Sequence, residues 1–532
     1  MTSIEDFTSQ YGLVQKIDAF GYLDYLKSNP DAPRKHGKVV LVTADTPLKA
    51  SRGEGKTTTT IALIDALRER GIDAAAVLRQ PSMGITAAGS KGGASGGGKA
   101  SLTHPELIDW GLCGEMGAIE AAQNLLVSFA EKAVDDGKLD TILVPRVSEV
   151  PSRSLRQIAV DRGKGDVAER VVLTPTCELM QIVVLSRSMD EISERVAKMV
   201  AGTKDGKAVT FGEFVDLWRI TGILGDAVKP AKTETVNGSP VYVHGGPFAN
   251  IAHGCNSVLA TQMALTYGDY VITEAGFGAD LGAEKFFNIK CRKAGLSPKL
   301  TVIVATAQSL KLHGGVPEAQ IKEPNKEGLI RGFANLDKHI ENMKNFGQQV
   351  IVTFNRFASD TDEEIALVAE HCKEKGVGFA VNTVFADGGK GAVELARLVA
   401  ETIEKNTSKP LKFTYEESDS IRKKVRKIAE GIYGASSIVY TTLAEKKLKE
   451  IEKLGIAHFP VCIAKTQYSF SSDPKAYGVA KDFELKVRDI IINNGAEMIV
   501  VVMGEIMRMP GLPKEPQARH IDIVNGLIEG LS

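Results

Sequence analysis

The sequence predicts an α/β protein in which helices cover a mostly parallel sheet. Short runs of apolar, β-branched residues recur along the chain, with helical patterns between them. One of these runs leads through a glycine-rich turn directly into a helical pattern. The 532 residues are 43% hydrophobic and 25% charged, so the chain can bury a large core. At ~150 residues per domain, its length suggests about two to four domains.

The glycine-rich turn at residues 50–57 has the sequence context of a phosphate-binding P-loop. The apolar run Lys38–Ala44 precedes it, and a helical pattern at 58–67 follows it. A turn of small residues before a helix N-terminus directs several backbone N–H groups at one anion. Lys56 is then placed to reach the β- and γ-phosphates of a nucleotide, and Thr57 to hold Mg²⁺ through its hydroxyl. The alternative is an ordinary strand-to-helix turn.

The predicted nucleotide-binding residues share this turn and the first residue of the helical pattern. They are Ala50, Ser51, Arg52, Gly53, Glu54, Gly55, Lys56, Thr57 and Thr58.

Other elements follow the same alternation. A second apolar run, Ala74–Leu78, ends at Arg79, and the short crossover from the P-loop helix implies parallel strands. Further strands are predicted at 141–144, 181–185, 270–273, 300–305, 348–354, 378–384, 461–464 and 498–503. Helices are predicted at 17–26, 362–375 and 391–404.

Polar residues at the ends of these strands are candidates for a ligand site, because ligands bind at the carboxyl ends of strands in open α/β sheets. Glu274 and Asp280 follow the strand at 270–273, and such carboxylates commonly order Mg²⁺ and its waters. Asp280 is equally placed to cap the next helix. Thr306 follows the strand at 300–305 and is predicted to line the base or the phosphates, with core packing as the alternative.

Two aromatic residues follow consecutive predicted strands. Phe357 and Phe385 each stand just past a strand end, where two aromatic faces can enclose a flat heterocycle. Ordinary core or surface packing is the alternative for either residue. The glycine-rich stretch 89–99 is interpreted as a loop that covers a ligand rather than as a linker, because lysines stand near both ends and a strand end precedes it.

The remaining composition limits other functions. His244 and His253 lack the spacing of a zinc site, and structural hydrogen bonding is the alternative to catalysis. The six cysteines form no Cys-x-x-Cys pair, which predicts a reduced, cytoplasmic protein with thiols in its core. No secretion signal and no apolar run of ~20 residues is present. The net charge of −1 argues against a nucleic-acid surface.

Several long segments resemble the formate–tetrahydrofolate ligase family, also called 10-formyltetrahydrofolate synthetases. The resemblance runs from about Lys38 to the end of the chain. It is densest at 244–256, 273–292, 332–336, 347–360 and 503–513. It implies an enzyme that uses ATP to join formate to N10 of tetrahydrofolate through formyl phosphate. By this resemblance, Lys56 stabilises the transferred phosphoryl group, Arg79 holds formyl phosphate, and Phe357 and Phe385 stack on the pterin.

The resemblance also implies further properties. Family members use ATP with Mg²⁺, are activated by a monovalent cation and are usually homotetramers, with small-molecule substrates and neither nucleic acid nor membrane as partner. The predicted division is a P-loop nucleotide-binding domain at 1–350, an α/β folate-binding domain at 351–435 and a C-terminal α/β domain at 436–532.

The chain departs from the family pattern mainly near the phosphate and formate end, so it is expected to be a divergent member. Gln80 stands where relatives carry Glu, and Gly111, Glu115 and Gly117 stand where they carry two histidines and an Asp. Other departures are the longer loop at 48–52 and residues Ser90, Ser95, Lys99 and Ala358. Two alternatives therefore stay open: a paralogue that uses another small acid or amine acceptor, and a nucleotide- and folate-binding protein without ligase turnover.

Overall fold

The computed structural model describes residues 3–12, 14–48, 53–86, 95–161, 166–506, 508–524 and 527–529. Within them, ten strands form one large sheet. In spatial order these are β1 (Thr8–Tyr11), β2 (Val14–Ile17), β14 (Ala231–Glu234), β15 (Pro240–Val243), β4 (Ala74–Leu78), β16 (Tyr270–Glu274), β3 (Lys38–Ala44), β17 (Leu300–Ala305), β18 (Gln349–Asn355) and β19 (Gly378–Asn382). Neighbours from β15 to β19 are parallel, whereas β1, β2, β14 and β15 pair antiparallel. The predicted class is confirmed.

Helices cover both faces of this sheet, because successive side chains of a strand point to opposite faces. On β3, Val40 and Val42 belong to a core that includes α2 (Lys56–Glu69) and α15 (Val393–Glu404). Val39 and Leu41 belong to a second core with α11 (Ala307–His313) and α12 (Lys326–Asn345). The central strands are therefore buried on both sides, as an apolar run without alternation predicts.

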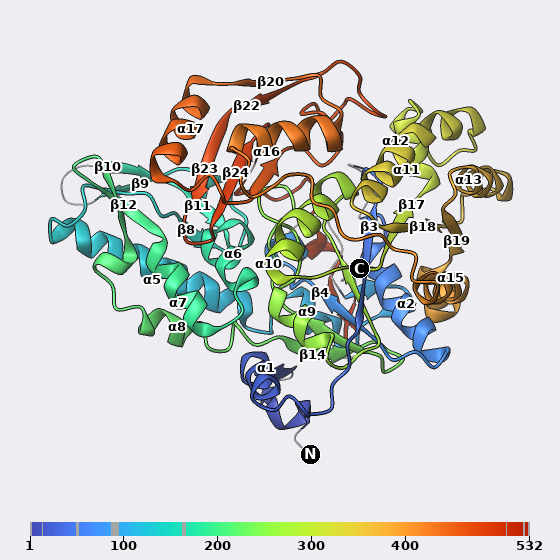
Figure 1. The fold of residues 1–532 in the computed structure, drawn as a ribbon, viewed down its shortest axis with the longest axis horizontal. Coiled ribbons are helices and arrows are strands. Elements are labelled where there is room, and N and C mark those ends of the chain that lie inside the picture. Colours follow the sequence, from blue (N-terminus) through green and yellow to red (C-terminus); the bar gives the residue numbers. More distant parts are fainter. Residues whose placement is uncertain are drawn as a thin grey trace.

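Two further regions pack beside the sheet (Figure 1). The first lies between β4 and β14 in sequence and contains α5 (Glu115–Asp135), α6 (Glu178–Leu185), α7 (Met189–Lys198) and α8 (Trp218–Ile223). The second is the C-terminal region, with α16 (Ile421–Ile428), α17 (Thr442–Leu454) and the sheet β21 (Val461–Ala464), β24 (Met498–Val502), β23 (Asp489–Asn493).

The C-terminal sheet shares its packing with both other regions. On β21, Val461 and Ile463 belong to the same core as α11 and α12, whereas Cys462 and Ala464 belong to the core of α5, α6 and α7. This strand is thus buried on both faces by different parts of the chain. The C-terminal region is therefore held by apolar contacts against the α11 and α12 face of the large sheet and against the region of α5, α6 and α7.

Most predicted elements match the structure. β4, β17 and β21 have the predicted bounds, and β16, β18, β19, β24, α13 (Asp362–Glu374) and α15 differ by a few residues. The strand predicted at 181–185 is wrong, because these residues lie in α6, where the Cys177 side chain accepts the Met180 N–H as a helix cap. A short apolar run fits a buried helix as well as a strand. The helix predicted at 17–26 is α1 (Ala19–Ser28), and only β7 (Thr141–Ile142) forms in 141–144.

The predicted domain boundary near residue 350 falls inside β18. Since β18 and β19 continue the large sheet beyond β17, the segment after residue 350 shares that sheet with the P-loop strand β3. The division into three domains stays a prediction.

All six cysteines are buried and free, which agrees with their prediction as core residues. They are Cys113, Cys177, Cys255, Cys291, Cys372 and Cys462. Across the ranges given above, no helix is both long and apolar enough to cross a membrane.

Gly332 tests how closely α12 packs on α11. A Cβ atom at Gly332 would lie 1.9 Å from the carbonyl oxygen of Leu310, so Gly332→Ala must push the two helices apart. We expect a loss of about 1–3 kcal/mol in the free energy of unfolding, measured by urea denaturation. Gly222→Ala in α8 is the control, because nothing lies within 4 Å of its Cβ position. Equal stability of the two variants would contradict this packing.

Candidate functional site

The candidate site lies at the carboxyl edge of the large sheet. β16 lies between β4 and β3, so the residues that follow these three strands meet at one edge. Arg79 follows β4, Glu274 ends β16, and the loop after β3 leads into α2. This is where the sequence predicted a ligand site.

The described part of the predicted nucleotide loop begins at Gly53, so Ala50, Ser51 and Arg52 lie outside the described residues. Gly55 precedes α2 with φ 87°, and a Cβ atom there would lie 2.5 Å from Asn355 Nδ2. Only glycine fits this position without strain.

Two hydrogen bonds position Glu54, one within the loop and one from the end of β18. Asn355 Nδ2 donates to the carbonyl oxygen of Glu54 at 3.2 Å, and the Leu48 N–H donates to Glu54 Oε1 at 3.0 Å. Thr58 follows Thr57 in the first turn of α2. The loop therefore ends at a helix N-terminus, where free backbone N–H groups can bind a phosphate group.

Glu274 joins the predicted catalytic and metal-binding residues. The Thr57 hydroxyl donates to Glu274 Oε2 at 2.8 Å, and Arg79 Nε lies 3.8 Å from Glu274 Oε1. Arg79 Nε has no hydrogen-bond partner, and its side chain is 24% exposed while Glu274 is buried. The guanidinium group is thus held at the site by charge and keeps donors for an anionic ligand.

Lys56 lies in a strongly charged environment. Desolvation lowers the pKa of Lys56, whereas the nearby carboxylates of Glu54 and Glu274 raise it. The net shift of the Lys56 pKa is downward, because burial outweighs the attraction of these carboxylates.

Sequence reasoning missed Asp45. This residue follows β3 and is fully buried, and its Oδ2 accepts a 2.5 Å hydrogen bond from Ser309 Oγ. Burial and the charge of Glu54 raise the pKa of Asp45 well above its usual range. Its position at the end of a buried strand, directly before the P-loop, was the available signal.

Thr306 and Asp280 have structural partners. Thr306 caps α11, because its hydroxyl accepts the Ser309 N–H at 3.0 Å. Asp280 does not cap the following helix and instead pairs with Lys465 of the C-terminal region at 3.1 Å, with both side chains fully buried. A nucleotide role for Thr306 stays a prediction.

Phe357 and Phe385 stand on adjacent strand ends, as predicted, because β18 pairs with β19. Phe385 is 63% exposed and Phe357 is 38% exposed. The Lys99 N–H donates to the carbonyl oxygen of Phe385 at 3.0 Å, so the end of the glycine-rich stretch contacts the short helix α14 (Val384–Asp387), which carries Phe385. Residues 87–94 of that stretch lie outside the described residues. Two large exposed aromatic side chains that follow adjacent strands suit a ligand surface better than a core.

Two residues that depart from the family pattern, Gln80 and Glu115, are buried and hydrogen-bonded. Gln80 Nε2 donates to the carbonyl oxygen of Ile108 at 2.6 Å. The Gly245 N–H donates to Glu115 Oε1 at 2.7 Å. Burial raises the pKa of Glu115 to about 7, and the charge of Lys16 opposes this shift. Both side chains therefore connect the segment at 108–117 to its neighbours.

The two candidate histidines differ. His244 is satisfied by Ser257 Oγ at 2.7 Å and the carbonyl oxygen of Ala227 at 2.8 Å, as the structural alternative requires. His253 has no hydrogen-bond partner on either ring nitrogen, and burial lowers its pKa to about 3, so the ring is neutral. A catalytic role for either ring stays a hypothesis.

Only a few of these residues are suited to bind a divalent cation. Among the described residues, no group of three or more His, Cys, Asp or Glu side chains could hold a metal ion. The Thr57 hydroxyl and the Glu274 carboxylate are hard oxygen donors within 2.8 Å of each other. This pair suits Mg²⁺, which takes one or two protein oxygens and completes its shell with water and substrate phosphates.

A parallel α/β sheet and a loop that ends at Gly55, before a lysine–threonine pair at a helix N-terminus, are typical of P-loop-type nucleotide-binding proteins. The sequence comparisons give the family. The family model described as formate–tetrahydrofolate ligase matches residues 3–532, and the chain belongs to that family.

Individual relatives agree over most of the chain. The chain is 63% identical over 506 residues to the formate–tetrahydrofolate ligase of Parabacteroides distasonis, covering 93% of this chain and 90% of that protein. It is 54% identical over 508 residues to the protein of that name from Bacteroides fragilis, covering 94% and 91%. For that of Bifidobacterium longum, the identity is 62% over 446 residues, covering 83% and 84%.

Glu115→Gln tests the charge state of the buried carboxyl group. Because the folded protein keeps the proton to about pH 7 and the unfolded chain releases it near pH 4.5, the folded state binds more protons between these values. The free energy of unfolding of the wild type should therefore fall by about 3 kcal/mol relative to Glu115→Gln as the pH rises through this window. Urea denaturation between pH 4.5 and 8 measures it, and a difference that does not change with pH would contradict the assignment.

Proposed function

We propose that this protein joins formate to N10 of tetrahydrofolate with ATP, giving 10-formyltetrahydrofolate, ADP and phosphate. The observation that carries the proposal is the meeting of Lys56, Thr57 and Arg79 around Glu274 at the sheet edge, in a chain of the formate–tetrahydrofolate ligase family. The proposed ATP site comprises the loop at 50–58 and Thr306.

The reaction proceeds in two group transfers. A formate oxygen attacks the γ-phosphorus of ATP, the bond to the β-phosphate oxygen breaks, and ADP leaves. N10 of tetrahydrofolate then attacks the formyl carbon, phosphate leaves, and the amine loses its proton. Lys56 offsets the negative charge that moves with the phosphoryl group, and Arg79 holds the acyl phosphate through its guanidinium group. Holding both reactants in line supplies much of the rate.

Two cations are expected for the reaction, and we propose residues for one of them. Thr57 and Glu274 are proposed to hold Mg²⁺, which supplies charge stabilisation to the ATP phosphates when bound. Activation by a monovalent cation is a further prediction from the family, and we assign no residues to it.

Tetrahydrofolate is proposed to bind between Phe357 and Phe385, where the pterin ring stacks on exposed aromatic faces. We also propose a homotetramer that works in the cytoplasm. The six free, buried cysteines support a reducing compartment.

One assay separates the proposal from its alternatives. Acid converts 10-formyltetrahydrofolate to the methenyl form, whose absorbance is followed with formate, acetate or no acid present. Product with formate alone supports the proposal. ATP hydrolysis that requires a different acid would indicate a paralogue with another substrate, and ligand binding without product would indicate a binding protein.

Lys56→Ala tests the role of the loop lysine. Without the ammonium group, kcat should fall by about two orders of magnitude or more, because a preorganised charge at the transferred phosphoryl group is lost. The affinity for tetrahydrofolate should stay near that of the wild type. Lys405→Ala, at an exposed lysine after α15, is the control. An unchanged kcat in Lys56→Ala would exclude this mechanism.

Phe385→Ala tests the folate slot. Loss of the stacked ring should raise the KM for tetrahydrofolate by an amount equivalent to about 1–3 kcal/mol, by analogy with aromatic stacking on nucleobases. Steady-state kinetics with each substrate varied in turn measures it, and Trp218→Ala removes an equally exposed aromatic side chain of α8 as the control. A change confined to the KM for ATP would place Phe385 in the nucleotide site instead.

A further inference from the structure

Two side chains link the start of the nucleotide loop to a segment that lies more than 400 residues later in the chain. Thr46 follows β3 and leads into the loop, and it is fully buried. The C-terminal segment, defined here as residues 465–478, follows β21. Two side chains between them in sequence, His313 at the end of α11 and Asn335 in α12, contact both.

His313 forms one hydrogen bond to the C-terminal segment and one to Thr46. The Gly478 N–H donates to His313 Nδ1 at 3.0 Å, and His313 Nε2 lies 3.2 Å from the carbonyl oxygen of Thr46. Since Nδ1 accepts a hydrogen bond, the ring proton is on Nε2 and is donated to Thr46. Burial lowers the pKa of His313 to about 4, so the ring is neutral at ordinary pH.

Asn335 forms a second, parallel connection. Its Nδ2 donates to Thr46 Oγ1 at 3.0 Å and to the carbonyl oxygen of Gly478 at 3.2 Å. Thr46 and Gly478 are therefore each bound twice, by the same two side chains. Thr46, His313 and Asn335 are buried and Gly478 is half-buried, and hydrogen bonds between buried groups are strong and costly to leave unmade.

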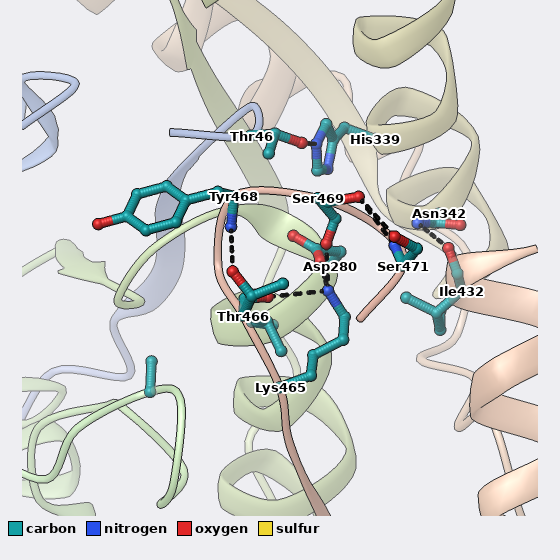
Figure 2. A network of polar contacts seen from close by, with 12 residues as sticks. Thr46, Asp280, His339, Asn342, Ile432, Lys465, Thr466, Tyr468, Ser469 and Ser471 are labelled. Carbon is teal, nitrogen blue, oxygen red and sulfur yellow. Dashed lines mark hydrogen bonds and ion pairs between the residues drawn. The ribbon is translucent and has the colours of Figure 1, made fainter. Parts of the chain in front are cut away.

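The C-terminal segment itself is firmly held. Figure 2 shows Lys465 reaching Asp280 and the carbonyl oxygen of Thr466, close to the Thr46–His339 pair. The rings of His339 and Phe470 lie 4.8 Å apart. The segment therefore has a fixed position from which to hold Thr46.

We propose that His313 and Asn335 are positioning residues through which the C-terminal segment fixes the start of the nucleotide loop, and so sets the affinity for ATP. The inference rests on the proposed ATP site. It assigns an energetic coupling between two parts of the chain, which a double-mutant cycle can measure.

Gly478→Ala alters the C-terminal side of this connection without touching the loop. Gly478 has φ 75°, and a Cβ atom there would lie 2.9 Å from the carbonyl oxygen of His313. Gly455→Ala is the matched control, because Gly455 also has a positive φ, 68°, lies in the C-terminal region and has nothing within 4 Å of its Cβ position. Both variants introduce similar backbone strain, but only the first displaces a residue bound to His313.

Calorimetric titration of the full-length variants with a non-hydrolysable ATP analogue and Mg²⁺ tests the proposal. Gly478→Ala should raise the Kd for the analogue by about fivefold or more. Gly455→Ala should leave it unchanged, and tetrahydrofolate should bind both variants as it binds the wild type. Equal Kd values for the analogue in the two variants would overturn the proposal.

His313→Asn completes the cycle. The Asn amide can still accept the Gly478 N–H but is too short to donate to Thr46. This variant should weaken binding of the analogue, and the effect of Gly478→Ala should be smaller in its background. Fully additive effects would overturn the proposal. If the wild type fails to bind the analogue, or Lys56→Ala binds it equally well, the proposed ATP site fails instead.

Discussion

The carboxylate of Glu274 connects the groups on which the proposed chemistry depends. It accepts the Thr57 hydroxyl with one oxygen and lies opposite Arg79 with the other. Its charge also opposes the lowering of the Lys56 pKa that burial causes. A buried carboxylate is costly unless it is paired, so these partners hold one another in place. If the carboxylate were absent, a guanidinium and an ammonium group would stand at the site without an opposing charge from this strand.

The sheet order produces this arrangement. β16 pairs with β3 on one side and with β4 on the other, so the residue that ends β16 lies between the loop after β3 and Arg79 after β4. Neighbouring strands lie ~4.8 Å apart, which brings side chains from three strand ends within reach of one phosphate group. The helices over both faces are what make so apolar a parallel sheet stable.

The sequence alone predicted the parts of this site that depend on local pattern. The bounds of β4 and β17, the strand–loop–helix unit around Lys56 and the adjacent positions of Phe357 and Phe385 follow from periodicity and turn residues. Local pattern could not decide residues 181–185, because an apolar run packs equally well as a helix.

Pattern also could not reveal contacts between distant segments. Asp280 was interpreted as a metal ligand or a cap, but it pairs with Lys465, 185 residues later. Thr46 and Gly478 meet only because α11 and α12 place His313 and Asn335 between them. Such contacts depend on how whole elements pack, which short-range spacing does not encode.

A crystal structure with a non-hydrolysable ATP analogue, Mg²⁺ and formate tests the central claim most directly. We predict density for the terminal phosphate between Lys56 and Arg79, with Mg²⁺ beside Thr57 and formate facing the terminal phosphorus. A nucleotide bound elsewhere, with the groups around Glu274 unchanged and in contact with solvent, would contradict it.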